Sequence, residues 1–180
     1  MTEHDAITLI RKAVPQPGGQ WADLGAGTGT FTRALASLVG ADGEVQAIEP
    51  NATSRRELER LAEQTNNATR ANISVVTGDF SRTLSLSGLS GILLANSLHF
   101  LSHANQAAVL RQLATYLRPL GRIVLVEYDS EVGNQWVPYP VSLLQFDALC
   151  TNAGLVAPAV SGRMPSAFGG ELYAAWTAVA

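Results

Sequence analysis

The sequence predicts an α/β fold in which a mostly parallel seven-stranded sheet carries helices on both faces and one antiparallel strand lies near the C-terminal edge. Apolar strand-like runs alternate with amphipathic helical segments along the chain, which is typical of a parallel sheet. The first strand runs directly into a glycine-rich turn and a helix. Residues 162–170 join the last two strands and are too few for a crossover helix, so these strands should pair antiparallel.

The individual elements follow from local patterns. The runs 91–95 and 122–127 are apolar throughout, as expected for central parallel strands. Gly40 suits the end of one helix, Pro119 follows the end of another, and Ser54 with Glu57 reads as a capping box. The expected strands are residues 20–24, 44–48, 73–76, 91–95, 122–127, 155–161 and 171–179. The expected helices are residues 5–14, 30–39, 54–64, 103–117 and 140–152.

The composition fits one globular domain over residues 1–180, with an N-terminal helical segment (1–17) before the core (18–180). Hydrophobic residues make up 47% of the chain, and the net charge of −3 gives no electrostatic case for nucleic acid or an anionic membrane. Cys150 is the only cysteine, which excludes an internal disulfide. The start of the chain does not look like a signal peptide, so we expect a cytoplasmic protein, and we expect no metal site.

The glycine-rich turn carries the strongest signal. Residues 23–30 read Asp-Leu-Gly-Ala-Gly-Thr-Gly-Thr, and its glycines let the backbone approach a ligand closely. A dinucleotide turn requires glycine where Thr30 stands, and a phosphate loop requires a following lysine, whereas Lys12 is the only lysine in the chain. Asp23 would repel a pyrophosphate and suits a ligand with a cationic amine.

This turn resembles motif I of the class I S-adenosylmethionine-dependent methyltransferases, and the resemblance extends over residues 18–180. It implies a Rossmann-like fold with S-adenosyl-L-methionine as the cofactor. Glu49, at the end of the second strand, takes the place of the ribose-binding acid, and Gly78-Asp79-Phe80 resembles the adenine motif. Leu120 replaces the first glycine of a Pro-Gly-Gly turn. The cofactor-binding residues implied are Asp23, Gly25, Ala26, Gly27, Glu49, Pro50, Asp79, Phe80, Asn96 and Ser97.

His99 is the catalytic candidate, because it follows the fourth strand at the edge where open sheets bind ligands. It could act as a general base or only shape the pocket, and nothing in the sequence supplies an acid to orient it. Tyr128, Trp136 and Tyr139 are candidates for a substrate pocket, although the last two could equally cap the core.

We therefore expect methyl transfer to a small-molecule acceptor through O, N, C or S. The alternatives are a non-catalytic cofactor-binding module that serves as a regulator or partner, and a nicotinamide-dependent oxidoreductase. Little chain surrounds the shared core, so the acceptor side should be open. A large acceptor, the N-terminal helix or a second subunit of a homodimer must close it, and the apolar Ile7 and Ile10 favour the helix.

Overall fold

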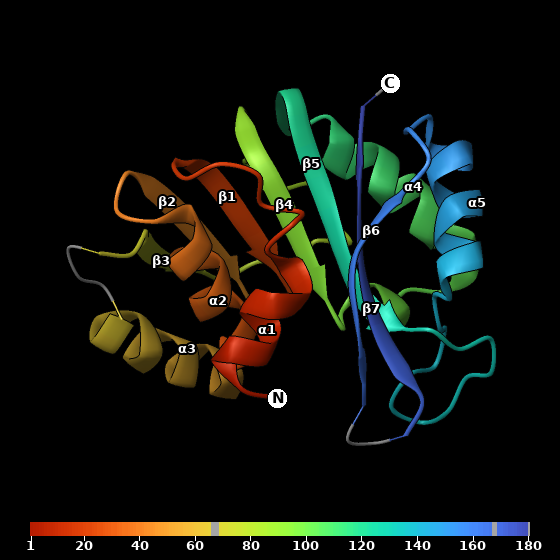
Figure 1. The fold of residues 1–180 in the computed structure, drawn as a ribbon, viewed down its shortest axis with the longest axis horizontal. Coiled ribbons are helices and arrows are strands. Elements are labelled where there is room, and N and C mark those ends of the chain that lie inside the picture. Colours follow the sequence, from red (N-terminus) through yellow and green to blue (C-terminus); the bar gives the residue numbers. More distant parts are fainter. Residues whose placement is uncertain (66–68, 167–168, 180) are drawn as a thin grey trace.

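The structure is a computed structural model that describes residues 1–65, 69–166 and 169–179. One seven-stranded sheet has the order β3-β2-β1-β4-β5-β7-β6 (Figure 1). The predicted reversed strand is confirmed, because β7 runs antiparallel to both β5 and β6 while the other pairings are parallel. The strands are β1 (Gly19–Leu24), β2 (Gly43–Ile48), β3 (Asn72–Val76), β4 (Leu89–Ala95), β5 (Leu117–Tyr128), β6 (Ala159–Pro165) and β7 (Glu171–Ala178).

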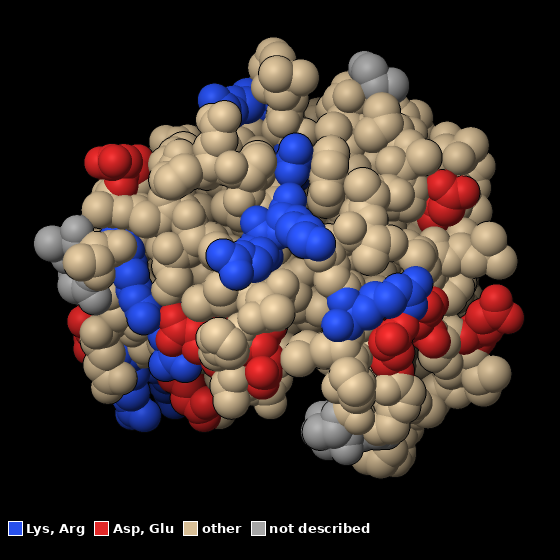
Figure 2. Space-filling model, viewed as in Figure 1, with Lys and Arg blue, Asp and Glu red and all other residues tan. Residues whose placement is uncertain are grey.

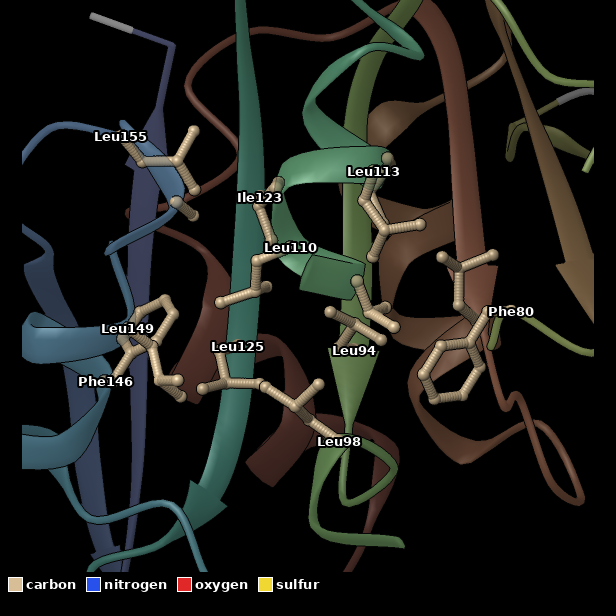
Figure 3. Close-up of a cluster of buried hydrophobic side chains, with 14 of the residues drawn as sticks. Phe80, Leu94, Leu98, Leu110, Leu113, Ile123, Leu125, Phe146, Leu149 and Leu155 are labelled. Atoms are coloured by element: carbon tan, nitrogen blue, oxygen red, sulfur yellow. The ribbon is translucent and has the colours of Figure 1, made fainter. Parts of the chain in front are cut away.

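Two apolar clusters cover the two faces of the sheet. On β5, Val124 and Val126 join the cluster beneath α1, α2 and α3, while Ile123 and Leu125 join the cluster beneath α4 and α5. Figure 3 shows the second cluster, with Leu110 of α4 lying over β5. The helices are α1 (Glu3–Ile10), α2 (Thr30–Val39), α3 (Ala52–Thr65), α4 (His103–Ala114) and α5 (Leu143–Ala153), and a 3-10 turn, η1, spans Leu98–Phe100. Among the described residues, no helix combines the length and apolar character needed to cross a membrane.

The N-terminal helix α1 is part of the packed core. Leu9 and Ile10 are buried in the same cluster as Trp21, and Glu3 pairs with Arg33 at 2.7 Å and with Arg70 at 2.9 Å. The expectation that Ile10 lies over the site is therefore wrong, because its side chain packs beneath the helix. These buried contacts and ion pairs hold α1 in place on the sheet.

Several element boundaries differ from those expected. Helix α3 begins at Ala52, because Asn51 Oδ1 accepts hydrogen bonds from the backbone N–H groups of Thr53 and Ser54 (2.9 and 3.0 Å); the capping box predicted at Ser54 is therefore wrong. Helix α4 ends at Ala114, and β5 starts three residues later. Strand β6 spans Ala159–Pro165 rather than 155–161.

Leu120 interrupts the regular course of β5. It has φ +66° and its side chain is 95% exposed. Leu120 thus has a left-handed backbone at the position where the Pro-Gly-Gly turn has its first glycine. A leucine adopts this conformation only with backbone strain.

Candidate active site

A cavity of about 650 Å³, here the first cavity, opens at the carboxyl ends of β1 and β4. The glycine turn forms one wall through Gly25 and Ala26, and Asn96 at the end of β4 forms another. The N-terminal Met1 and Met164 of β6 also line it. Figure 2 shows the molecule hollowed at this place, between the N-terminal end of α1 and the β6–β7 hairpin.

Asp23 is the buried acid of the first cavity. Its Oδ2 accepts a hydrogen bond from the Thr32 hydroxyl at 2.6 Å, whereas its Oδ1 is buried without a hydrogen-bond partner among the described residues. Burial raises the Asp23 pKa to about 7, the Thr32 hydrogen bond opposes this rise, and the charge of Glu49 adds to it. This carboxylate can therefore accept a further hydrogen bond from a cationic donor in the cavity.

Two glycines of the turn serve different purposes. A Cβ on Gly25 would come within 2.7 Å of Ser97 Cβ, so this glycine is needed for packing. Gly27 has φ +57°, and a Cβ there would meet no protein atom within 4 Å. The space beside Gly27 is thus left open by the protein itself, as a ligand cradle requires.

Glu49 holds the glycine turn against the start of α3. Its Oε2 accepts from the Gly27 N–H at 2.8 Å and its Oε1 from the Asn51 N–H at 2.7 Å. The side chain is 7% exposed. Pro50 beside it is exposed, and its carbonyl accepts from Arg55.

The end of β4 presents Asn96 and Ser97 differently. Asn96 has φ +51°, lines the first cavity, and has a buried Oδ1 without a partner among the described residues. The Ser97 hydroxyl donates to the Leu24 carbonyl at 2.9 Å, so it ties β4 to the end of β1. Ser97 therefore positions the turn.

The predicted adenine motif lies apart from the first cavity. Asp79 is exposed, and its hydrogen bonds from Ser81 lower its pKa. Phe80 is buried in the core cluster that contains Leu24. Gly27, Glu49 and Asp79 do not line the first cavity, which extends from Gly25 towards Asn96. That these three residues share one cofactor site with Gly25 stays a prediction.

His99 has a buried acidic partner that the sequence analysis missed. Its Nδ1 lies 2.6 Å from Glu127 Oε2, and its backbone N–H donates to Glu127 Oε1 at 3.2 Å. Both side chains are almost fully buried, and His99 belongs to neither cavity lining in the described structure. His99 follows the end of β4 and Glu127 lies near the end of β5, which pairs with β4 in parallel. The sequence could have indicated this contact, because the carboxyl ends of neighbouring parallel strands meet.

A second cavity, of about 820 Å³, adjoins the first at Tyr128, which lines both. Trp136 lines the second cavity and is 72% exposed. Tyr139 lies outside both linings: its N–H donates to the His99 carbonyl at 3.1 Å and its ring meets His103 edge-on. Two of the three predicted substrate-pocket residues therefore share a cavity.

A family model described as a methyltransferase domain matches residues 22–121, from β1 into β5. The chain belongs to this methyltransferase family. A search among curated proteins found no match. The match and the fold identify the enzyme as a class I S-adenosylmethionine-dependent methyltransferase.

Solved structures of methyltransferases share the fold. The methyltransferase is similar to the glycopeptide N-methyltransferase MtfA complexed with S-adenosyl-L-methionine, at 16% identity and TM-score 0.75 over 99% of this chain and 94% of that one. It is also similar to the mitomycin 7-O-methyltransferase MmcR (18%, TM-score 0.69, 97% and 54%) and to the CurJ carbon methyltransferase (16%, TM-score 0.75, 97% and 54%). The chain thus spans about half of the last two proteins.

The methyltransferase's own residues fit its cofactor, S-adenosylmethionine. The unpartnered Oδ1 of buried Asp23 suits the ammonium group, and the open space at Gly27 suits close approach of the ligand to the backbone. No phosphate-binding lysine follows the turn, in agreement with a cofactor that carries no phosphate.

Proposed function

We propose that this enzyme methylates a small-molecule acceptor that lies beside Tyr128, with the cofactor's methionine end in the first cavity. The observation that carries the proposal is the unpartnered, buried carboxylate oxygen of Asp23 beside a glycine turn that leaves space open at Gly27. The second cavity supports a small acceptor, because its volume of about 820 Å³ is typical of small-molecule sites.

Most of the predicted cofactor residues have a role in this proposal. Asp23 accepts from the ammonium group, while the turn at Gly25 and Ala26 lies against the methionine end. Glu49 keeps its two backbone donors and uses its remaining lone pairs for the ribose hydroxyls. Asp79 and Phe80 border the adenine from the β3 side, next to the exposed Pro50, which follows β2.

Bound S-adenosylmethionine supplies an electrophilic methyl group whose transfer breaks the sulfur–carbon bond, leaves the electron pair on sulfur and forms a bond to the acceptor atom. The protein's task is to align the acceptor with that methyl group and to exclude water. An acceptor O–H or N–H loses its proton to solvent or to a base. Asn96 and Tyr128, which both line the first cavity, are placed to orient the reacting groups.

We propose that His99 shapes the pocket rather than acting as the base. Glu127 binds both its ring and its backbone N–H, which anchors the η1 turn to β5. Because His99 is only 3% exposed and lines neither described cavity, this anchoring is the role its position favours. A general base would have to reach the acceptor directly.

Replacing Gly27 by Val tests the cofactor site. The added side chain fills the open space, so we expect S-adenosylmethionine binding, measured by calorimetry, to be lost in a folded protein. Gly88→Val is the matched control, because Gly88 has a similar φ of +66°, also has open space, and precedes β4 at the opposite end of the sheet. Normal binding by Gly27→Val would exclude this site.

A methyl-transfer assay with labelled cofactor and a panel of small molecules tests turnover. We expect label to be transferred to at least one acceptor. Tight cofactor binding without transfer to any small molecule would favour the alternative, a cofactor-binding regulatory module.

A further inference from the structure

We propose that the second cavity binds the body of the acceptor, and that this acceptor is a flat aromatic molecule with an amine that is protonated in the bound state. The inference rests on the proposed function, since it requires the cofactor in the first cavity. It adds the chemical class of the acceptor.

The position of the second cavity follows from Tyr128. This residue ends β5 and lines both cavities, so a molecule in the second cavity lies next to the first. Its other walls come from the loop after β5, including Val132 and Trp136, and from Gly170 and Glu171 of the β6–β7 hairpin.

The apolar wall of this cavity is exposed and held in place. Trp136 is 72% exposed and Val132 is 79% exposed, so a ligand there would remove apolar surface from water. Asn134 Oδ1 accepts from the N–H groups of Trp136 and Val137 at 2.8 and 2.9 Å. Because this turn fixes the backbone of Trp136, the indole is presented with little loss of backbone entropy on binding, which favours a flat aromatic partner.

The charges around the site select against anions. The two side chains in the described lining of the second cavity that can carry a full charge at neutral pH are both acids, Asp129 and Glu171. Arg163 contacts both Asp129 and Glu171, but one guanidinium against two carboxylates leaves a net negative charge. A carboxylate or phosphate on the acceptor would be repelled, whereas an ammonium group would be attracted by Glu171 and by the face of Trp136.

Three probes with the same phenol ring test the charge preference: cationic tyramine, neutral 4-ethylphenol and anionic 3-(4-hydroxyphenyl)propanoate. Each is titrated by calorimetry into protein saturated with S-adenosylhomocysteine, so that no methyl group is transferred. We expect tyramine to bind about tenfold or more tightly than the propanoate, with 4-ethylphenol between them. Equal or tighter binding of the propanoate, or no binding of any probe, would overturn the proposal.

Two variants localise the effect. Trp136→Ala should weaken tyramine binding about tenfold, whereas Leu144→Ala, an equally exposed apolar residue outside the described linings, should not. Glu171→Gln should reduce the preference for tyramine over the propanoate. Unchanged tyramine binding by Trp136→Ala would also overturn the proposal. The binding of S-adenosylhomocysteine is measured first: its absence would refute the proposed function, while intact cofactor binding without a charge preference refutes this inference alone.

Discussion

Removing the hydroxyl of Thr32 should shift the pH dependence of cofactor binding to higher pH. Asp23 must be ionised to bind the cofactor's ammonium group, and its pKa is about 7 in the protein without ligand. Thr32 donates to Asp23 Oδ2 at 2.6 Å and is fully buried. Thr32→Val therefore removes this hydrogen bond to the carboxylate while nearly keeping the shape of the side chain. Thr32→Ser keeps the hydroxyl and is the matched control.

The magnitude follows from the hydrogen bond that is lost. A buried hydrogen bond to a charged group contributes about 1.5–3 kcal/mol, which corresponds to about one to two units of pKa. The Asp23 pKa in Thr32→Val should therefore rise to about 8–9. At pH 7 the ionised fraction falls from about one half to about one tenth or less, so the affinity for S-adenosylmethionine should fall about fivefold or more.

Calorimetric titrations with S-adenosylmethionine between about pH 5.5 and pH 8.5 measure this shift. In the unmodified enzyme, affinity should decline as the pH falls through the Asp23 pKa, since the proton and the ammonium group compete for the carboxylate. Thr32→Ser should behave similarly. The reasoning is refuted if affinity does not change over this range, or if Thr32→Val titrates at the same pH as Thr32→Ser.

Four further outcomes are expected. Asp23→Asn should stabilise the cofactor-free protein above pH 7 by up to about 4 kcal/mol in chemical denaturation. The raised Asp23 pKa contributes stability that is fully present below the carboxyl pKa of the unfolded chain and is lost as the pH rises through about 7. Equal free energies of unfolding for the two proteins at pH 8 would contradict this. Leu120→Gly should raise the melting temperature through about 0.5–1 kcal/mol of relieved strain, and a lower melting temperature would show that φ +66° costs nothing here. His99→Gln should keep most of the turnover and the pH–rate limb, whereas a loss of about a hundredfold would establish it as the general base. Deleting residues 1–14 should lower the melting temperature sharply, because Leu9 and Ile10 are core residues; an unchanged melting temperature would show that α1 is only a cover.

Sequence patterns were enough for the parts of this protein that depend on local chemistry. The glycine turn after β1 and the apolar central strands follow from a few neighbouring residues each, and the resemblance pointed to the cofactor from the same residues. The antiparallel pairing of β6 and β7 was predicted because a short connection leaves the chain no other arrangement. The capping of α3 was misread, since Asn51 and Ser54 are both good caps and the sequence does not rank them.

Tertiary structure decided what depends on residues far apart in the chain. The contact of His99 with Glu127, 28 residues later, exists because β4 and β5 are neighbours and their ends meet. The pKa of Asp23 is set by burial under α2, which composition does not reveal. Side chains from both ends of the chain, Met1 and Met164 among them, line one cavity only after the sheet has assembled. A sequence records which groups are available, whereas desolvation and distance, which govern their chemistry, are properties of the packed fold.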